Sequence, residues 1–409
     1  MLPKKGINRT IAIAAMWVLA TFYVVQTYGL SYTWNFSRLA SLFLGLIYLF
    51  TSGKSLIKNA IPTSIMIILL YRVIIHVLYN FPSNIIPVDS ILMFITFFLF
   101  WNTFDLKYFE KIYTKLGVFF VLFFFIQYVA KFFGVVIPGI FSFLPISLND
   151  LGDYWWDAKR DLESRPSSFF SEASHFAEYL IPLLLLKLYK ENKSKQDYYV
   201  LIIVFLGLLL SQSGTAMLGL GLIGMAFVVY LIVNNNVSFF KMIIPIGLAV
   251  GAIFLYLRSE AGQSLFERTA EISIERENGV GQSAYQRMFR SYYVYDHYSL
   301  IEKITGTDNP EAIKRHYENN DAAETFGSDT DTFANTYQGC LLKTGFIGLV
   351  LFLWLMGGLW KGNSYLGKAI LFVYLGLGFI SPMYFTNPMT LYLLLAVSQK
   401  TKFANHNTL

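Results

Sequence analysis

The boundary between a polar segment and an apolar run near residue 172 carries side chains suited to acid–base chemistry. The segment reads RPSSFFSEASHFAEYL and begins at Arg165. Pro166 is unfavourable inside a helix, so Arg165 belongs to the loop. Ser171 fits an N-cap, which would make Glu172 the first helical residue and place His175 on the same face. Glu172 and His175 therefore form a candidate general base, although a hydrated pair that only caps the helix fits the same pattern.

A second candidate pair, Arg72 and His76, lies inside the apolar run MIILLYRVIIHVLY. Their spacing of four places both on one helical face. A charge at mid-depth in a membrane costs about 2.5–3.5 kcal/mol, so such a residue turns toward the bundle interior and a partner. We expect Glu178, one turn beyond His175, or Asp89 to be that partner. The pair indicates a site for an anionic headgroup, a proton path, or a structural ion pair.

The late polar segment, residues 259–340, is rich in arginine and includes Arg268, Arg276, Arg287 and Arg290. A guanidinium group matches phosphate oxygens bidentately and stays charged, which indicates an anionic ligand. Ordinary solvated charges on a long loop fit the same composition. The triplet at 329–331, DTD, resembles a metal-binding motif, but a hard cation needs several more oxygen ligands. We therefore expect no metal site and no cofactor.

The composition of the chain indicates the solvent that surrounds the helices on which these candidate residues lie. Of the 409 residues, 55% are hydrophobic and only 14% are charged, against roughly 25% charged in soluble proteins. Such a chain cannot cover a water-facing surface, which indicates lipid as its main solvent. The single cysteine, Cys340, excludes an intrachain disulfide framework and a zinc cluster of the usual spacing.

Apolar runs long enough to cross a bilayer recur along the whole chain. A crossing needs about 20 apolar residues, and such runs lie near 10–28, 38–52, 60–79, 87–104, 114–136, 173–189, 198–212, 214–233, 241–258, 341–360, 365–382 and 388–399. The pattern predicts an all-α polytopic membrane protein with about twelve transmembrane helices in one domain over residues 1–409. The first run is long enough to be a retained helix rather than a cleavable signal peptide.

The positions of the basic residues predict the topology of these helices. With the first segment in the cytoplasm, the lysine-bearing segments alternate onto the cytoplasmic side, and the short loops near 29–36, 80–86 and 383–387 contain no Lys or Arg. This is the positive-inside pattern. It predicts two cytoplasmic termini and two long extracytoplasmic loops, 137–172 and 259–340. The net charge of +6 is thereby explained as a topology signal, and no nucleic-acid partner is expected.

Several short motifs resemble those of the bacterial O-antigen polymerase and O-antigen ligase superfamily. Residues 165–176 resemble its R…F-x-E-P-S-x-F segment, and LLSQSGTA at 209–216 resembles L-T-x-S-R-x-A/G. Arg268 stands in an R-x10-G spacing with Gly279, and Gly306-Thr307 lies where the family often has G-x-G. NTY at 335–337 and GFIG at 345–348 resemble H-N-x-Y/F…G-x-x-G. The motifs cover 165–350, and the topology covers the whole chain.

The resemblance implies a metal-independent glycosyltransferase of GT-C type in the bacterial cytoplasmic (inner) membrane. Its substrate would be an undecaprenyl-diphosphate-linked oligosaccharide, used in O-antigen, lipopolysaccharide, capsule or exopolysaccharide biosynthesis. Membrane lipid, a chain-length regulator and the flippase of the lipid-linked unit would be its partners. Carried over, Arg165 and Arg287 would stabilise the leaving diphosphate, with Arg268 and Arg290 in support.

The resemblance also assigns roles to the polar residues on the helices. Glu172 would deprotonate the acceptor hydroxyl, with His175 as an intermediary. Asn335 and Tyr337 of the 335–337 motif would contact substrate. Apart from the resemblance, we expect Arg72 and His76 to bind substrate, because a basic pair inside an apolar run suits an anionic headgroup.

Two departures from the family pattern bear on the choice between its activities. Ala173 replaces the proline after the glutamate, and Ala334 stands where ligases tend to have histidine. The missing histidine favours a polymerase over a ligase and leaves the general base to come from elsewhere. A flippase for the same lipid-linked unit is the alternative from another class, but no internal repeat of the kind common in transporters is evident.

Overall fold

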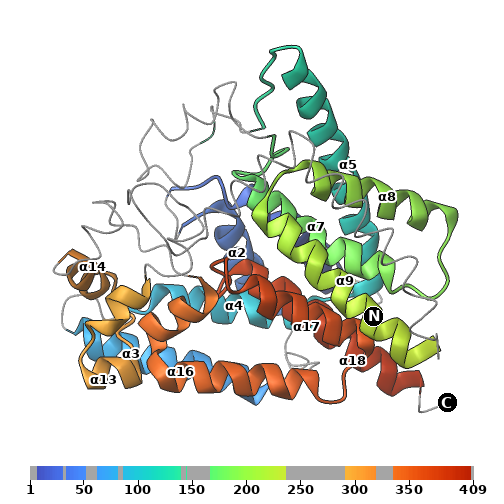
Figure 1. The fold of residues 1–409 in the computed structure, drawn as a ribbon. Helices are drawn as coiled ribbons and strands as arrows, with labels where there is room; N and C mark the ends of the chain where they lie inside the picture. Colours follow the sequence, from blue (N-terminus) through green and yellow to red (C-terminus); the bar gives the residue numbers. More distant parts are fainter. Residues whose placement is uncertain are drawn as a thin grey trace.

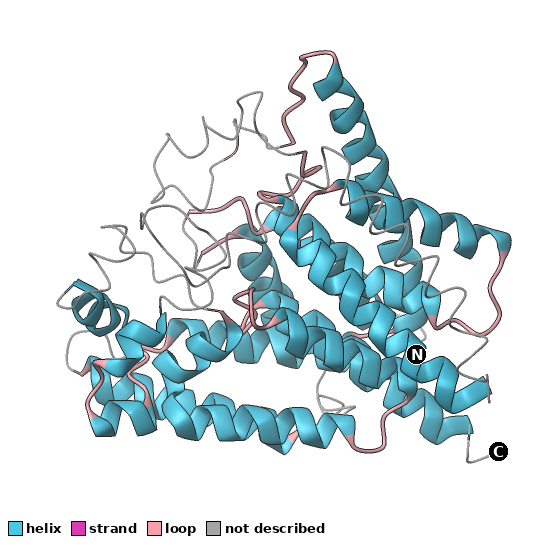
Figure 2. Cartoon of the chain, viewed as in Figure 1, coloured by secondary structure: helices cyan, strands magenta, loops and turns pink. Residues whose placement is uncertain are grey.

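The computed structural model describes residues 7–30, 34–51, 62–81, 86–139, 144, 166–235, 291–318 and 335–406. Within these ranges the regular structure is helical, and no strand is present (Figure 2). The extended pairing in the described part is an isolated bridge between Gly29 and Asn35. The predicted all-α class therefore holds for the described residues.

The predicted apolar runs coincide with helices, apart from 241–258, which lies outside the described residues. The long helices are α1 (Ile7–Val25), α2 (Phe36–Thr51), α3 (Thr63–Asn80), α4 (Val88–Thr103), α5 (Leu106–Phe132), α7 (Ala173–Leu188), α8 (Lys195–Leu210), α9 (Gly214–Asn235), α16 (Thr336–Trp360), α17 (Tyr365–Leu377) and α18 (Asn387–His406). Two short helices, α13 (Leu300–Thr305) and α14 (Pro310–Glu318), belong to the late polar segment.

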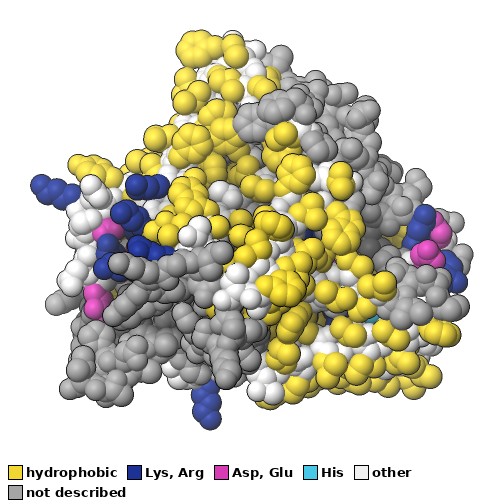
Figure 3. All heavy atoms as spheres, turned by 180° about the vertical axis from the view of Figure 1, so that it is seen from behind, with side chains coloured by type: hydrophobic (Ala, Val, Ile, Leu, Met, Phe, Trp, Pro, Cys, Tyr) yellow, Lys and Arg dark blue, Asp and Glu magenta, His cyan; other side chains and the backbone are white. Residues whose placement is uncertain are grey.

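The surface of the bundle is suited to lipid. Among the described residues, 4 helices are long and apolar enough to cross a membrane, namely α3, α5, the 214–233 part of α9, and α16. Helices α1, α2, α4 and α17 are shorter apolar helices. Large apolar side chains such as Leu70, Leu78 and Phe119 are 61%, 67% and 53% exposed, and Figure 3 shows a broad hydrophobic area on one face of the molecule. The chain is a membrane-embedded helical protein; the total of about twelve crossings stays a prediction.

Helix α7 lies at the centre of the bundle and packs against α5, α8, α9 and α17 (Figure 1). After its first turn the sequence ASHFAEYLIPLLLLKL is apolar apart from Glu178 and Lys187 and the hydroxyl of Tyr179. A helix of this kind is stable only when it is covered on all sides, and from Phe176 to Lys187 every side chain is buried. Tyr113 on α5 donates a hydrogen bond to the carbonyl of Tyr179, beside the internal Pro182. The residues at each end of α7 are therefore held rigidly.

A cluster of charged side chains lies at the C-terminal end of α7. Lys187 Nζ is 2.8 Å from Glu110 Oε1 on α5 and 3.2 Å from Asp197 Oδ1 on α8. Lys190 Nζ is 2.7 Å from the other oxygen of Asp197. All of these residues fall in segments that the sequence assigns to the cytoplasmic side. Helix ends that the predicted topology places together on the cytoplasmic side therefore contact one another here.

Candidate active site

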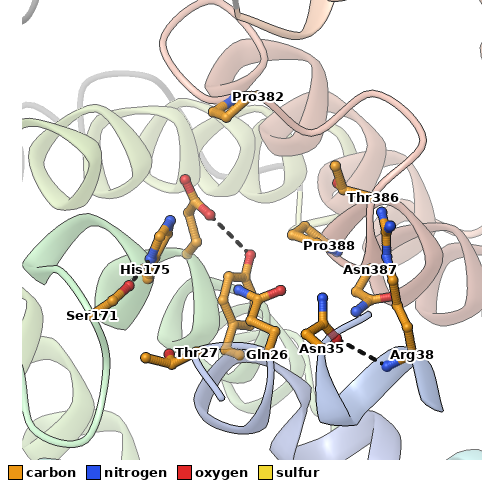
Figure 4. A pocket seen from close by; sticks show the side chains of 12 residues that line it. Gln26, Thr27, Asn35, Arg38, Ser171, His175, Pro382, Thr386, Asn387 and Pro388 are labelled. Carbon is orange, nitrogen blue, oxygen red and sulfur yellow. Dashed lines mark hydrogen bonds between the residues drawn. The ribbon is translucent and has the colours of Figure 1, made fainter. Parts of the chain in front are cut away.

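A polar pocket lies at the opposite end of α7, where several helices begin or end (Figure 4). Its walls come from the end of α1 and the loop after it, the start of α2, the first turns of α7, and the loop that leads into α18. The lining residues are Tyr23, Gln26, Thr27, Asn35, Arg38, Ser171, His175, Glu178, Pro382, Thr386, Asn387 and Pro388. All of these segments fall at helix ends that the predicted topology places on one side. Amide, hydroxyl, imidazole, guanidinium and carboxylate groups thus face one space in a largely apolar protein.

The hairpin between α1 and α2 positions one wall of the pocket. The Gly29–Asn35 bridge closes this hairpin, and Phe36 N donates to Tyr28 O at 2.8 Å. Asn35 Oδ1 accepts from the backbone N–H of Arg38 at 3.0 Å, which starts α2 beside the pocket. Asn387 Nδ2 donates to Ser37 Oγ at 3.0 Å and ties the start of α18 to the same hairpin.

The opposite wall is the start of α7, which the preceding loop holds against α5. Gln127 Nε2 donates to Ser168 O at 3.2 Å, and Ser168 N donates back to Gln127 Oε1 at 2.7 Å. Phe170 is fully buried and packs against the rings of Phe176 and Tyr179. Burial of an aromatic side chain of this size is a strong anchor, so the first turn of α7 has a defined position.

Glu178 is the buried carboxylate of the pocket. It is 4% exposed, and its Oε2 accepts a hydrogen bond from Tyr23 Oη at 3.0 Å. Tyr392 on α18 donates to the backbone carbonyl of Glu178 at 3.4 Å. Because Glu178 follows His175 by three residues, both side chains share one helical face and both line the pocket. The expectation that Glu178 continues the face of His175 is confirmed.

The predicted Glu172–His175 arrangement needs a correction. The N-cap of α7 is Glu172 rather than Ser171, and the helix begins at Ala173. Glu172 has extended backbone angles (φ −145°, ψ 156°), so its side chain does not follow the helical face, and Ser174 Oγ donates to its Oε2 at 2.7 Å. His175 Nδ1 instead lies 2.6 Å from Ser171 Oγ. His175 lines the pocket, whereas Glu172 is not among the lining residues.

Arg72 and His76 find a partner that the sequence did not indicate. Arg72 Nη2 is 3.2 Å from Asp308 Oδ1, and His76 Nδ1 is 3.4 Å from Asp308 Oδ2. The expected partner Asp89 is farther from Arg72, at 3.9 Å, and the other expected partner, Glu178, contacts Tyr23 instead. The pair is therefore an ion-pair site with the late polar segment.

The ion pairs extend from this site to the pocket. Arg38, which lines the pocket, donates from Nη1 to Asp89 Oδ1 at 2.6 Å, and the second oxygen of Asp89 faces Arg72. The guanidinium of Arg72 also lies over the ring of Phe385, 5.4 Å from its centre. A line of charged groups thus links Arg38 in the pocket to Asp308 in the late segment.

A close approach of two glycines places Asp308. Gly345 has φ 62° and ψ −165° and interrupts α16, and an added Cβ there would meet the backbone of Gly306 and Ile304. The break leaves the carbonyl of Leu342 to accept from Thr307 N at 3.1 Å. Only glycine adopts such angles readily, so the Gly306-Thr307 motif acts as a backbone docking point. Residue 308 is then held against α3.

Charge and burial together determine the protonation of Asp308. Burial would raise the pKa of this carboxyl, but the positive charge of Arg72 and the hydrogen bond with His76 hold the pKa below its usual range. The side chain is 6% exposed and has φ 39°, an uncommon angle for a residue other than glycine. A strained, ionised aspartate in a polar network indicates a position set by its partners.

Asn335 and Tyr337 are engaged within the protein. The side chain of Asn335 caps α16 by accepting from Tyr337 N and Gln338 N at 3.1 and 2.9 Å, and its Nδ2 donates to Phe379 O at 3.0 Å. Tyr337 Oη donates to Leu375 O at 2.7 Å. These contacts fasten α16 to the end of α17. Contact of either residue with substrate stays a prediction.

The four arginines predicted to bind the diphosphate, Arg165, Arg268, Arg287 and Arg290, lie outside the described residues. The triplet 329–331 also lies outside them. Within the described ranges no group of three or more His, Cys, Asp and Glu side chains is arranged to hold a metal ion. The roles of these arginines stay predictions.

Most residues of the pocket were not identified from the sequence, and among them and their network Tyr23, Arg38 and Asp308 make the polar contacts described above. Tyr23 gives no local signal, because a tyrosine in an apolar helix is ordinary. Arg38 does give a local signal. It is a basic residue at a helix end that the predicted topology places on the extracytoplasmic side, where the positive-inside rule predicts few basic residues. Asp308 directly follows the Gly306-Thr307 motif, which marked its position but not its role.

Comparison with protein families gives one match. Residues 199–353 match the family model described as O-antigen ligase. The matched segment contains most of α8, all of α9, the late polar segment with Asp308, and most of α16, but it does not include α1, α2 or α7. No curated protein and no solved structure matches the chain.

Proposed function

Since the chain belongs to the O-antigen polymerase and ligase superfamily, we propose that it is a polymerase of lipid-linked oligosaccharide repeat units. A growing glycan would be transferred from undecaprenyl diphosphate to the acceptor sugar of another lipid-linked unit. We place the reaction on the outer face of the bacterial cytoplasmic membrane, with both termini in the cytoplasm. The flippase of the lipid-linked unit would supply the substrate, and a chain-length regulator would be a partner.

The pocket at the end of α7 is the observation that carries this proposal. It gathers polar side chains from α1, α2, α7 and the start of α18, and the ion pairs Arg38–Asp89 and Arg72–Asp308 connect it to the late polar segment. A water-exposed glycan and a membrane-bound carrier must meet at such a boundary. The described part of the late segment, which includes Asp308, is thus linked to the pocket by ion pairs.

In the proposed reaction the arginines act on the leaving group, and the pocket binds the acceptor. The anomeric C–O bond to the diphosphate breaks, and the electron pair leaves with undecaprenyl diphosphate. Arg165 and Arg287, supported by Arg268 and Arg290, would stabilise the charge that develops on this leaving group. The acceptor hydroxyl forms the new glycosidic bond and loses its proton. The pocket would hold the acceptor sugar, and no metal is required in this scheme.

An O-antigen ligase is the second candidate, because the matching family model carries that description. A ligase would transfer the glycan to a different acceptor. The presence of Ala334 where ligases tend to have histidine favours the polymerase.

Arginine variants in a host strain that lacks its own copy of the chain test this proposal. Arg165→Ala and Arg287→Ala should each leave single-repeat glycans on gels while the protein still inserts at normal levels. Loss of one diphosphate contact of this kind costs about 10²–10³ in rate. Arg315→Ala is the matched control, because Arg315 is an exposed arginine of the late segment that donates to the carbonyl of Glu311 in its own helix.

The outcomes separate the candidate functions. Full-length chains in both arginine variants would overturn the assigned roles of those residues. Purified protein incubated with lipid-linked single repeat units should produce a ladder of longer glycans. If no ladder forms and the host deletion traps the lipid-linked units on the cytoplasmic side, the chain is a flippase and not a polymerase.

A further inference from the structure

Glu178 differs from the other buried carboxylates of the described chain in the charge of its partners. Asp197 is bound by Lys187 and Lys190, and Asp308 is bound by Arg72 and His76. In the part of the chain that the structure describes, no cation lies within ion-pair distance of Glu178. Its hydrogen-bond donor is the neutral hydroxyl of Tyr23 at 3.0 Å.

A carboxylate placed in this way is costly for the fold. Burial of a charge without a paired cation is strongly unfavourable, and ionisable residues within membrane helices usually have a functional role. A chemical role at the pocket explains why a carboxylate stands here.

The other side chains of the pocket are suited to a sugar. Asn35, Asn387 and Gln26 present amides that both donate and accept, and Thr27 and Thr386 present hydroxyls. Such groups match the hydroxyls of a sugar ring, each of which both donates and accepts. Arg38 adds a cation to the same wall. The acceptor end of the substrate, rather than its lipid tail, fits this lining.

We propose that Glu178 is the general base that receives the proton of the attacking acceptor hydroxyl. This inference rests on the proposed glycosyl transfer and names a residue for its missing step, since Ala334 stands at the position of the ligase histidine. The acceptor oxygen forms the bond to the anomeric carbon while its proton passes to a Glu178 oxygen. The bond to the diphosphate breaks, and the carboxyl returns its proton to water after product leaves.

Tyr23 acts as a positioning residue in this arrangement. Its hydroxyl donates to Oε2 of Glu178, and its ring packs edge-on against Tyr179, so the orientation of the hydroxyl is restricted. The second oxygen of the carboxylate is thereby oriented for the acceptor. Glu172 is less suited, because its extended backbone places it outside the lining of the pocket.

The proposal is tested with full-length purified protein and lipid-linked single repeat units extracted from a host strain deleted for this chain. Glu178→Gln keeps the shape of the side chain and an oxygen that accepts from Tyr23 but is not basic. We expect kcat to fall about 10²–10⁴-fold, as for other general bases, with KM for the lipid-linked unit within about threefold of wild type. Glu178→Asp, which keeps a carboxylate, should retain more activity than Glu178→Gln. Tyr23→Phe should lower kcat about tenfold without a change in KM.

Two further variants make the test specific. Glu191→Gln is the matched control, since Glu191 is exposed beyond the opposite end of α7, and it should retain wild-type kinetics. Glu172→Gln tests the other glutamate. A large fall in kcat for Glu172→Gln together with less than a tenfold fall for Glu178→Gln would overturn the proposal in favour of Glu172.

The remaining outcomes are equally decisive. An increase in KM with kcat unchanged in Glu178→Gln would assign Glu178 to binding only and overturn its role as base. Equal loss in Glu178→Gln and Glu178→Asp, with both proteins monodisperse on size exclusion, would show that the shape of the side chain matters rather than its basicity. If wild-type protein forms no ladder, the proposed function fails; if wild type forms a ladder and Glu178→Gln matches its rate, only the role of Glu178 fails.

Discussion

Asp308 and Glu178 are two buried carboxylates near the same end of the bundle, and their surroundings differ in one decisive respect. Asp308 is held by Arg72 and His76 at 3.2 and 3.4 Å, whereas Glu178 receives a hydrogen bond from the neutral Tyr23 at 3.0 Å. A paired carboxylate is already neutralised and serves to join parts of the fold. The carboxylate beside the tyrosine hydroxyl has no such cation and lines the pocket. We therefore assign a structural role to Asp308 and propose a chemical role for Glu178.

The two carboxylates also reach their positions by different routes. Glu178 belongs to α7, the best-covered helix of the bundle, and its place follows directly from the helical spacing with His175. Asp308 belongs to a loop and is brought to α3 by the docking of Gly306 and Thr307 on the interrupted helix α16. The ion pair of Asp308 therefore forms only when Gly306 and Thr307 are docked on α16.

Removal of the cation from the paired site should give the largest effect on stability. Arg72→Ala leaves Asp308 buried with His76 as its remaining partner, and we expect a loss of about 3–5 kcal/mol in unfolding free energy. Thermal unfolding of purified protein in detergent measures it. The double variant Arg72→Met with Asp308→Leu should recover most of the loss, because apolar pairs replace buried ion pairs at little cost.

Thermal unfolding of Glu178→Gln tests whether the carboxylate in the pocket also has a structural role. Glu178→Gln keeps the hydrogen bond from Tyr23 and should change stability by less than about 1 kcal/mol. If Glu178→Gln destabilised the protein as much as Arg72→Ala, both carboxylates would be structural and the distinction between them would fail.

A substitution at the glycine contact should give an intermediate effect confined to the paired site. In Gly345→Ala the new methyl group meets the backbone of Gly306, and φ of 62° with ψ of −165° is strained for any other residue. We expect a destabilisation of about 1–3 kcal/mol and faster proteolysis of the late segment. Gly358→Ala on the same helix is the control, because nothing lies within 4 Å of its added Cβ. Equal protection of the late segment in both variants would show that it docks by other contacts.

Acidification should give the smallest effect. The charge of Arg72 holds the pKa of Asp308 below its ordinary value despite burial, so the ion pair contributes stability above the unfolded pKa of about 3.9 and loses it as the pH falls through the lower folded value. The stability difference between wild type and Asp308→Asn should shrink as the pH falls below about pH 4. Asp296→Asn, an exposed carboxylate of the same segment, is the control. A difference that grew in acid would contradict the assigned direction.

Local patterns in the sequence were sufficient for the helices of the described residues. Apolar runs predicted the helices because a membrane helix must satisfy its backbone internally and cover it with apolar side chains. The lysine pattern predicts one side of the membrane for the segments that carry Lys187, Glu110 and Asp197, which contact one another at one end of α7; the topology itself stays a prediction. The spacing of three between His175 and Glu178 was also sufficient to place both on one face.

The exact start of α7 shows where local reasoning was insufficient. Both Ser171 and Glu172 are plausible at the N-terminus of a helix, and the choice depends on how the buried Phe170 and the Ser168–Gln127 hydrogen bonds orient the chain. A shift of one residue moved Glu172 off the helical face. The sequence therefore pointed to this junction, but Glu178 rather than Glu172 lines the pocket; the catalytic role of either glutamate stays a prediction.

What the sequence determined by itself is a helical membrane protein with a polar junction at the start of one helix and charged residues in need of partners. The periodicity of helices and the cost of polar groups in lipid act locally, so they can be read from neighbouring residues. Only the tertiary structure decided the partners. Asp308 is 236 residues from Arg72, and Tyr23 is 155 residues from Glu178. Packing brings such distant residues together, and this packing distinguishes the carboxylate that joins the fold from the one that faces the pocket.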